Sequence, residues 1–377
     1  MHRFIAQRVL WNVPVLLLIT VVTFGMMQLV PGGPFTASSS GRPVPPEIKA
    51  NMEAKYGLDK PAWQQYLSYM SRLVLHFDFG PSLRRPGYTV NSIIFGPNFM
   101  VEVLREQLRA TFGREASSMT FAKPPNLFDS QALVVKTNRD VVGYISIGWG
   151  ERLAAIRRFL TLAPIMVSAQ VGLVSVVMAL VVGVPLGIVS ALKQNSWVDY
   201  VAMFTSMLGV SIPNFLLGIL MILLFALTLE VLPTYGWGND WKQVIMPAVT
   251  LGTNGMAIIA RLTRASMLEV IRADYIRTAR AKGLRESVVI LRHALKNSLI
   301  PVTTVLGPMM AAWLTGSFMV EWVFSIGGIG KYFITAVTDR DYTLIMGTIL
   351  VYSLAVVLFN LLVDIAYGFI DPRIRFD

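Results

Sequence analysis

The sequence contains no cysteine among its 377 residues and only three histidines. The lack of cysteine excludes disulfide bonds, thiolate metal sites and cysteine nucleophiles. The histidines (His2, His76 and His293) lie far apart along the chain, so no spacing suggests that they share a metal ion. We therefore expect neither a metal centre nor a disulfide framework.

Motifs for nucleotide binding and for hydrolysis are also missing. The stretch Gly328-Ile329-Gly330-Lys331 looks like the end of a phosphate-binding loop. However, Tyr332 stands where a Ser or Thr must hold magnesium, and Ser325 stands where the first glycine is required. The sequence has no HExxH, no GxSxG and no defensible pair of catalytic carboxylates. We expect a chain that is not an enzyme, that uses no cofactor and that takes its energy from a partner.

Charged residues are scarce, at 15% of the chain, whereas 54% of the residues are hydrophobic. With a mean hydropathy of +0.57, this composition is typical of a polytopic membrane protein. A net charge of +11 would suggest a nucleic-acid partner in a soluble protein. Here the basic residues divide between short loops and one long polar segment, without an aromatic-rich basic groove, so we expect no nucleic-acid binding.

Six long uncharged runs alternate with polar segments. Each meets or nearly meets the length of about 20 residues that a helix needs to cross about 30 Å of hydrocarbon. We therefore predict an all-α membrane protein with six transmembrane helices, in the runs Val9–Val30, Thr161–Leu192, Tyr200–Leu229, Gln243–Ala260, Asn297–Val320 and Tyr342–Val363. The first run is too long for the core of a cleaved signal peptide and lacks a small-x-small cleavage site. Within the runs, Pro185 and Pro213 predict kinks, and Gly183 with Gly187 predicts a close helix contact.

The distribution of basic residues predicts the orientation. Arg3 and Arg8 precede the first run, and a dense basic cluster lies between the fourth and fifth runs. Because cytoplasmic loops carry an excess of Lys and Arg, both termini are expected in the cytoplasm. This gives a first segment 1–30, an extracytoplasmic region 31–160, a five-helix core 161–370 and a cytoplasmic tail 371–377.

Residues 86–160 of the extracytoplasmic region predict a small folded subdomain between the first two spans. Met100–Phe112 has the pattern of a helix, and Ala132–Lys136 and Val141–Ile147 have the pattern of strands. We interpret the segment as an inserted α/β subdomain without a ligand of its own. The alternative is a ligand-binding subdomain, because its second half faintly resembles the closing segment of phosphate-type periplasmic binding proteins.

The most informative stretch runs from Asp274 to Pro301. Asp274 is expected to cap a helix over Tyr275–Lys282, and Gly283 is expected to end it in a left-handed conformation. A second amphipathic helix is predicted to begin near Glu286 and Ser287. A short capped helix that projects from a membrane domain suggests a docking site for another protein. The alternative is a basic helix lying on anionic lipid.

This stretch resembles the cytoplasmic loop of ABC-importer permeases of the oligopeptide, dipeptide and nickel type. The resemblance rests on the run from Tyr275 to Leu284, on Arg292-His293-Ala294-Leu295 and on Pro301. The Glu-Ala-Ala sequence of the wider superfamily appears here as Arg277-Thr278-Ala279, without the Glu. Further matching motifs are Pro31-Gly32-Gly33-Pro34, Tyr56-Gly57-Leu58-Asp59-Lys60-Pro61, Asp78-Phe79-Gly80-Pro81-Ser82, Gly327-Gly328-Ile329-Gly330, Arg340-Asp341-Tyr342 and Asp371-Pro372-Arg373.

The resemblance implies a type I importer permease in the inner or plasma membrane of a prokaryote. It implies that the loop 264–297 carries a coupling helix that docks on an ATPase subunit, formed by Asp274, Tyr275, Ile276, Arg277, Thr278, Ala279, Arg280, Ala281, Lys282 and Gly283. The implied partners are a second homologous permease, one or two ATPase subunits, an extracytoplasmic binding protein and membrane lipid. Peptides are the expected cargo, with nickel and other small solutes as alternatives.

Two acidic residues near apolar runs, Glu321 and Asp364, are candidates for a gate or for the translocation pathway. A structural ion pair is an equally good explanation for Asp364. The rival function is a membrane receptor or scaffold that binds a cytoplasmic partner through the same loop.

Overall fold

The computed structural model describes residues 2–29, 33–35, 44–85, 88–113, 116, 119–121, 125–128, 130–136, 142–238, 240–314 and 316–370. These residues form two compact units. Unit 1 comprises Met1–Met26, Ser168–Ile334 and Thr348–Asp377, and unit 2 comprises Met27–Val167 and Thr335–Gly347. The predicted tail 371–377 lies outside the described residues.

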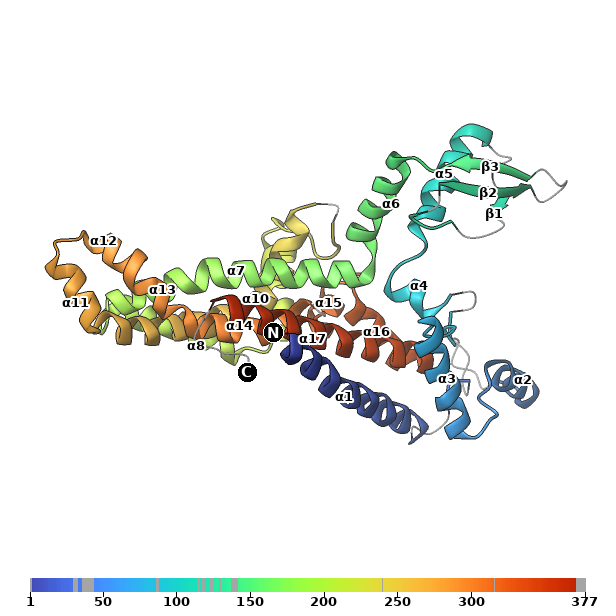
Figure 1. Cartoon of the computed structure of the whole chain (residues 1–377), viewed down its shortest axis with the longest axis horizontal. Helices are drawn as coiled ribbons and strands as arrows, with labels where there is room; N and C mark the ends of the chain where they lie inside the picture. Colours follow the sequence, from blue (N-terminus) through green and yellow to red (C-terminus); the bar gives the residue numbers. More distant parts are fainter. Residues whose placement is uncertain are drawn as a thin grey trace. The chain divides into compact units, whose positions relative to one another are not determined.

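Unit 1 contains the long apolar helices (Figure 1). The helices that lie wholly or mainly in this unit are α1 (His2–Leu29), α7 (Pro164–Leu192), α8 (Trp197–Ser211), α9 (Asn214–Met221), η2 (Ile222–Thr228), α10 (Lys242–Ile271), α11 (Asp274–Ala281), α12 (Glu286–Val288), η3 (Val289–Ala294), α13 (Leu295–Ser298), α14 (Ile300–Leu314), α15 (Phe318–Val323), α16 (Ile329–Asp339) and α17 (Tyr342–Ile370). The elements η2 and η3 are short π-helical segments.

Among the described residues, five helical segments are long and apolar enough to cross a membrane: Leu10–Leu29, Pro164–Leu192, Lys242–Ile271, Ile300–Val323 and Tyr342–Leu362. The predicted run Tyr200–Leu229 is bent by 104° between α8 and the helix formed by α9 and η2, so the kink predicted at Pro213 is confirmed. Pro213 has no N–H to donate, and its ring disfavours a helical conformation at the preceding residue. Ile212 is accordingly extended, with φ −86° and ψ 121°. A count of six spans therefore requires that α8, α9 and η2 form one bent span.

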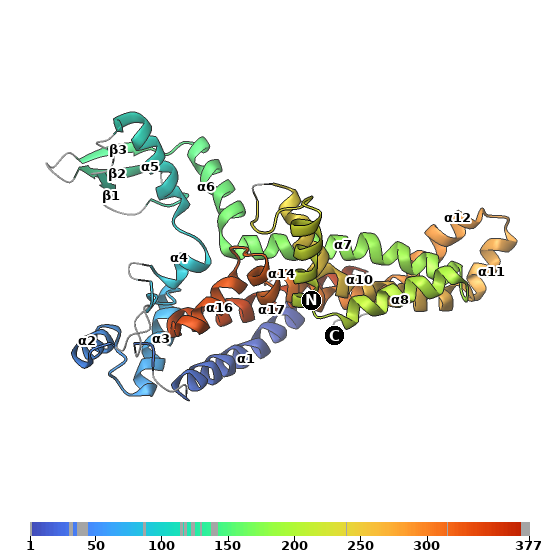
Figure 2. The ribbon, with the colours of Figure 1, turned by 180° about the vertical axis from the view of Figure 1, so that it is seen from behind.

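Small residues allow α7 and α10 to approach closely, and both views show the two helices side by side (Figures 1 and 2). A Cβ atom at Gly187 would lie 2.5 Å from the carbonyl oxygen of Ala260. A Cβ atom at Gly183 would lie 3.1 Å from Cβ of Ile259. The predicted glycine face is confirmed, and it fixes α7 against α10 over one helical turn.

Unit 2 contains the predicted α/β subdomain. Its elements are α2 (Pro46–Tyr56), α3 (Ala62–His76), α4 (Val90–Ile94), α5 (Phe99–Phe112), β1 (Met119–Phe121), β2 (Gln131–Lys136), β3 (Val142–Ser146) and α6 (Trp149–Leu162). The strands form an antiparallel sheet in the order β1-β2-β3, with Leu133 paired with Tyr144. The predicted helix and both predicted strands are confirmed, whereas β1 and α6 were not predicted.

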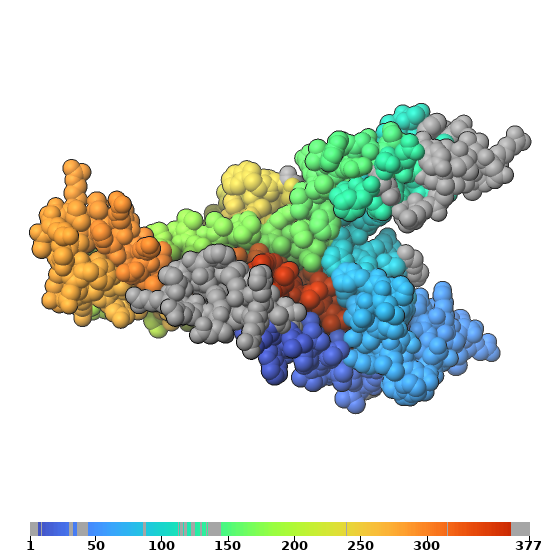
Figure 3. All heavy atoms as spheres, in the orientation of Figure 1, coloured from blue at the N-terminus to red at the C-terminus, as the bar shows by residue number. Residues whose placement is uncertain are grey.

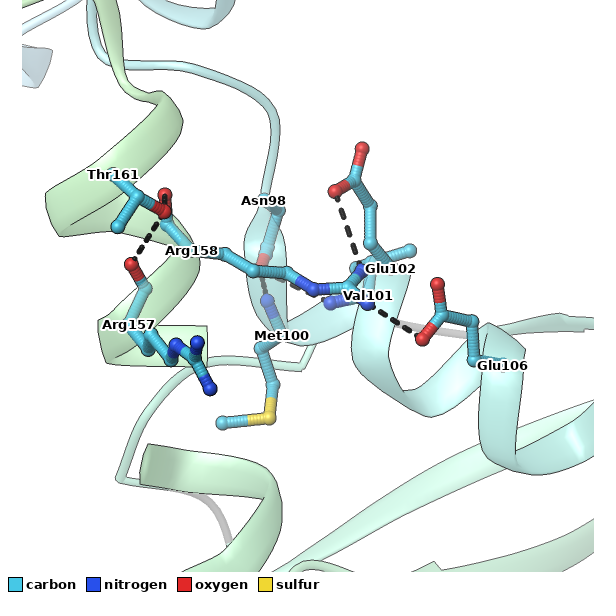
Figure 4. Close-up of polar contacts among 8 residues, drawn as sticks. All are labelled: Asn98, Met100, Val101, Glu102, Glu106, Arg157, Arg158 and Thr161. Carbon is cyan, nitrogen blue, oxygen red and sulfur yellow. Dashed lines mark hydrogen bonds and ion pairs between the residues drawn. The ribbon is translucent and has the colours of Figure 1, made fainter. Parts of the chain in front are cut away.

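Helices α5 and α6 are joined by an apolar core and by polar contacts (Figure 4). Leu104 of α5, Ala132 of β2 and Ala155 of α6 are buried in the same cluster. Arg158 of α6 lies 2.5 Å from a carboxylate oxygen of Glu106 and 3.8 Å from one of Glu102. Asn98 caps α5, because its Oδ1 accepts hydrogen bonds from the N–H groups of Met100 and Val101, at 3.1 and 3.3 Å. The contacts hold the helices and the sheet together as one subdomain.

Two motifs that lie far apart in the sequence meet elsewhere in unit 2. The buried carboxylate of Asp341 accepts hydrogen bonds from the hydroxyl of Ser82 and from the N–H of Leu83, at 3.1 Å for the latter. It also accepts one from the N–H of Leu344, at 3.2 Å. Asp341 thus joins the segment that follows α3 to the start of α17, which gives both sequence motifs a structural role.

Candidate functional site

The basic stretch between α10 and α14 forms the helix α11, which projects at one end of unit 1 (Figure 3, orange). Helix α10 ends at Ile271 and α11 begins at Asp274, so only Arg272 and Ala273 separate them. The predicted helix over Tyr275–Lys282 is confirmed with a shift of one residue at each end. A connection of two residues leaves little freedom between α10 and α11.

The start of α11 differs from the prediction. Ala273 is the N-cap residue, and no side chain caps the helix, so the prediction of an Asp274 cap was wrong. Ala273 has an extended backbone, which starts the helix one residue earlier than expected. The carboxylate of Asp274 instead lies 3.5 Å from Nη1 of Arg277. An acidic side chain in the first turn still complements the helix dipole.

The end of α11 is as predicted. Gly283 has φ +74°, and its N–H donates a hydrogen bond to the carbonyl oxygen of Arg280 at 2.9 Å. A Cβ atom at this position would meet no other atom within 4 Å. Glycine is therefore favoured here by the left-handed backbone conformation and not by close packing.

One face of α11 packs against α7, α10 and η3 of the same unit, and the rest of the helix is exposed. Ile276 and Ala279 are buried in a cluster with Met267 of α10, Ala191 of α7, and Val289 and Ala294 of η3. The exposed residues of the stretch include Asp274, Tyr275, Arg277, Thr278, Arg280, Ala281, Lys282 and Gly283. The inward face anchors the helix, and the outward face carries most of its charge.

Two polar contacts hold α11 to the following segment. Arg280 binds Glu286 through two hydrogen bonds, Nη2 to Oε1 at 2.7 Å and Nε to Oε2 at 3.2 Å. The hydrogen bond from Arg280 lowers the pKa of Glu286, and the hydrogen bond to Glu286 raises the pKa of Arg280. Asn297 donates a hydrogen bond to the hydroxyl of Tyr275 at 2.8 Å. The helix is thus held near both ends, by a side chain of α12 and by one of α13.

Glu321, one of the two candidate pathway residues, is fully buried in α15. Its Oε1 accepts a hydrogen bond from the hydroxyl of Ser168 at 2.7 Å, and its Oε2 accepts one from the N–H of Gly330 at 2.8 Å. Ser168 in turn accepts a hydrogen bond from the N–H of Ile329 at 2.9 Å. Glu321 therefore joins α7, α15 and the start of α16. Its role in the pathway stays a prediction.

Asp364, the other candidate pathway residue, lies in α17, but its side chain is outside the part of the chain whose side chains the structure describes. Its role in the pathway stays a prediction. The contacts of Glu321 belong to α7 and α16, so Glu321 and the predicted coupling helix form separate sites.

Comparison with known proteins identifies the family. Residues 183–376 match the family model described as binding-protein-dependent transport system inner membrane component. Residues 1–90 match the model of the N-terminal part of such membrane components. The chain belongs to this family. Together the two models leave residues 91–182 unmatched, and this stretch includes α5, α6 and the sheet of unit 2.

Curated relatives match this permease over its whole length. The dipeptide transport system permease protein DppB of Bacillus subtilis is 36% identical, covering 100% of this chain and 98% of the relative. The oligopeptide transport system permease protein OppB of Salmonella typhimurium is 36% identical, covering 100% of both chains. Among solved structures, the inward-facing MetNI methionine ABC transporter aligns with a TM-score of 0.45 and 19% identity, covering 57% of this chain and 98% of that chain.

Membership of the family decides three predictions. The permease is a multi-pass membrane subunit of a transport system, which rules against the receptor or scaffold interpretation. Its family and its relatives are named as membrane components and permeases, which confirms that the chain itself is not an ATPase. The predicted resemblance to the oligopeptide and dipeptide permeases is also confirmed.

The structure also contains a polar site in the permease that sequence reasoning missed. The buried carboxylate of Asp199, in the first turn of α8, forms an ion pair with the half-buried Arg264 of α10. The only signal in the sequence was Asp199 directly before the apolar run Tyr200–Leu229. An exposed loop residue would give the same pattern, so the sequence did not indicate a buried site.

Proposed function

We propose that this permease forms half of the translocation pathway of a peptide importer. Its full-length relatives are named for dipeptide and oligopeptide transport, which supports peptides as cargo. The other half of the pathway is a second permease of the same family. Six spans follow if α8, α9 and η2 cross the membrane as one bent span, with lipid around the exposed apolar faces.

The exposed face of α11 is the proposed docking site for an ATPase subunit. This proposal rests on one observation: α11 is anchored by Ile276 and Ala279 while its charged residues stay exposed at the end of the unit. A helix that merely lay on lipid would need neither the left-handed stop at Gly283 nor the contact between Arg280 and Glu286. A helix that is anchored in this way can transmit a movement of the ATPase to α10.

In this mechanism ATP closes the ATPase dimer, which draws together the coupling helices of the two permeases. Their movement opens the pathway toward an extracytoplasmic binding protein that delivers the peptide, a rigid-body transition. Both termini then lie in the cytoplasm, and the α/β subdomain within residues 86–160 lies outside the cell, near the docked binding protein. We assign this subdomain a role in docking rather than in binding peptide.

The main test is co-purification in mild detergent of the tagged permease with the proteins it binds in its own cells. Mass spectrometry should identify an ATPase, a second permease and a binding protein that carries a peptide. Arg280→Glu places an anion at the end of α11 and removes the contact with Glu286, so it should reduce the recovered ATPase. Lys296→Glu, a matched charge reversal on α13, should recover the ATPase normally. Equal recovery from both variants argues against docking at α11.

A second test concerns the orientation. The chain has no cysteine, so a single cysteine at Ser130 or at Ser287 labels one defined position. Both serines are exposed. Ser130→Cys should react with an impermeant thiol reagent in intact cells, whereas Ser287→Cys should react only after the membrane is broken. The opposite pattern overturns the proposed topology. Asn138, the other predicted labelling position, lies outside the described residues.

A further inference from the structure

The carboxylate of Asp199 is the centre of a buried polar site at the turn between α7 and α8. Asp199 is 2% exposed, and it lies in the first turn of α8, the first helix of the bent apolar pair. A buried carboxylate is strongly destabilising unless charge and hydrogen bonds compensate it. The contacts of this one side chain therefore show which elements are held together.

Asp199 is compensated by three elements. From α10, Arg264 donates through Nε to Oδ1 at 2.7 Å and through Nη2 to Oδ2 at 2.6 Å, a bidentate contact. From α7, the hydroxyl of Ser190 donates to Oδ1. From the turn itself, the N–H of Asn195 donates to Oδ2 at 3.0 Å. Each carboxylate oxygen thus accepts two hydrogen bonds, and one side chain joins α7, α8 and α10.

The site lies close to the predicted coupling helix along the chain. Arg264 precedes Asp274 by ten residues on the same continuous helix α10 and its short connection. Two further contacts attach this region to the end of α10 and to α11. Arg272 donates a hydrogen bond to Oε1 of Gln194 at 3.3 Å, and Ala191 is buried against Ile276 of α11. The turn between α7 and α8 is thus attached both to α10 and to α11.

We propose that the Asp199–Arg264 pair is a positioning device that makes the turn between α7 and α8 move with the coupling helix. The proposal rests on the proposed docking of an ATPase at α11. A movement of α11 is transmitted to α10 through the short connection at Arg272 and Ala273. The ion pair passes it to the ends of α7 and α8, so three transmembrane elements respond together. Without the pair, the turn keeps only its apolar packing and the contact of Arg272 with Gln194, so less of the movement reaches the start of α8.

The test uses the complete complex of permease, second permease, ATPase and binding protein, reconstituted in liposomes. The readout is the amount of peptide imported per ATP hydrolysed, which a loss of stability alone does not change. In the double variant Asp199→Asn with Arg264→Gln, no unpaired charge stays buried, so the complex should still assemble. We expect ATP hydrolysis within about twofold of wild type and import per ATP reduced about tenfold, within the range typical of coupling between sites.

Two buried serines provide a matched pair of single variants. Ser190 donates to Asp199, whereas Ser206 donates to the carbonyl oxygen of Ala202 within its own helix at 2.8 Å. Both are fully buried, so each change to alanine removes one buried hydroxyl. Ser190→Ala should lower import per ATP, whereas Ser206→Ala should leave it unchanged. If the double variant does not assemble, this comparison still tests whether the Asp199–Arg264 pair has a positioning role.

The outcomes separate this proposal from the proposed function. If the wild-type permease recovers no ATPase, docking at α11 fails, and this proposal fails with it. If the wild-type complex imports peptide and both Ser190→Ala and the double variant keep wild-type import per ATP, the positioning role is overturned while the docking proposal stands. If Ser190→Ala and Ser206→Ala lose import per ATP equally, the pair has only a structural role.

Discussion

Replacing Gly283 tests whether the shape of α11 matters for transport. The position has φ +74°, where an L-residue costs about 1–2 kcal/mol and a β-branched residue is a marked outlier. A Cβ at this position meets no atom within 4 Å, so steric contact adds nothing to that cost. The penalty of Gly283→Val thus falls on the end of α11 alone.

A penalty of about 1–2 kcal/mol lowers the equilibrium ratio of native to non-native helix end by a factor of about 5–30. We expect normal membrane insertion of Gly283→Val, weak recovery of the ATPase and loss of peptide uptake. Gly283→Asn is the matched control, because asparagine tolerates the left-handed region better than other L-residues. Its uptake should lie between those of wild type and Gly283→Val.

Three measurements on the same cell preparations give the result: the amount of permease in the membrane, the amount of co-purified ATPase and the initial rate of peptide uptake. Wild-type uptake by Gly283→Val would refute the reasoning. Equal loss from the Asn and Val variants would also contradict it, because it would show that any side chain, rather than the backbone conformation, is the obstacle.

Three further predictions concern the packing around Glu321, the turnover of ATP and the contact between Arg280 and Glu286. Gly330→Ala should lower the thermal stability of the purified permease by about 1–3 kcal/mol, because its Cβ would lie 2.8 Å from Cα of Phe318 and 2.9 Å from Oε2 of Glu321. Gly327→Ala should keep the wild-type melting temperature, because a Cβ at this position meets nothing within 4 Å. Equal melting temperatures of the two variants would refute the close packing of Gly330 against Phe318 and Glu321. The purified chain alone should not turn over ATP, and turnover that persists after contaminating ATPases are removed would contradict this. The pKa of Glu286 is lowered by Arg280, so their contact stabilises α11 fully above the ordinary Glu pKa of about 4.3 and is lost as the pH falls through the lowered value. Amide protection of α11 should fall in that acidic window in wild type but not in Glu286→Gln, and the same fall in both would exclude this contact as the cause.

The features that sequence predicted well depend on local chemistry. The end of α11 could be predicted from Gly283 alone, because a glycine directly after a helical pattern commonly ends the helix in the left-handed conformation. The strands around Ala132 and Val142 follow from alternation, and α5 follows from its helical periodicity. The start of α11 was wrong by one residue because Asp274 is acceptable both as a cap and in the first turn.

The features that sequence missed depend on residues far apart in the chain. Pro213 predicts a break, but the angle of 104° depends on how α9 packs against other helices. Asp199 and Arg264 are separated by 65 positions, and no local pattern pairs them. Glu321 was predicted as a pathway residue because a buried acid in a membrane helix suggests function. Its hydrogen bonds from Ser168 and Gly330 become apparent only once α7 and α16 are folded against α15.

The most direct test of the central claim is a cross-link from α11 itself. Ala281 is exposed at the end of α11, and Ala281→Cys places a single thiol there in a cysteine-free chain. Treatment of the native membrane with a short thiol-to-amine cross-linker, followed by mass spectrometry, identifies the protein in contact with this position. We predict a cross-link to an ATPase subunit whose yield changes when ATP binds. A cross-link only to lipid or to the permease itself, in a complex that imports peptide, would contradict the assignment of α11 as the coupling helix.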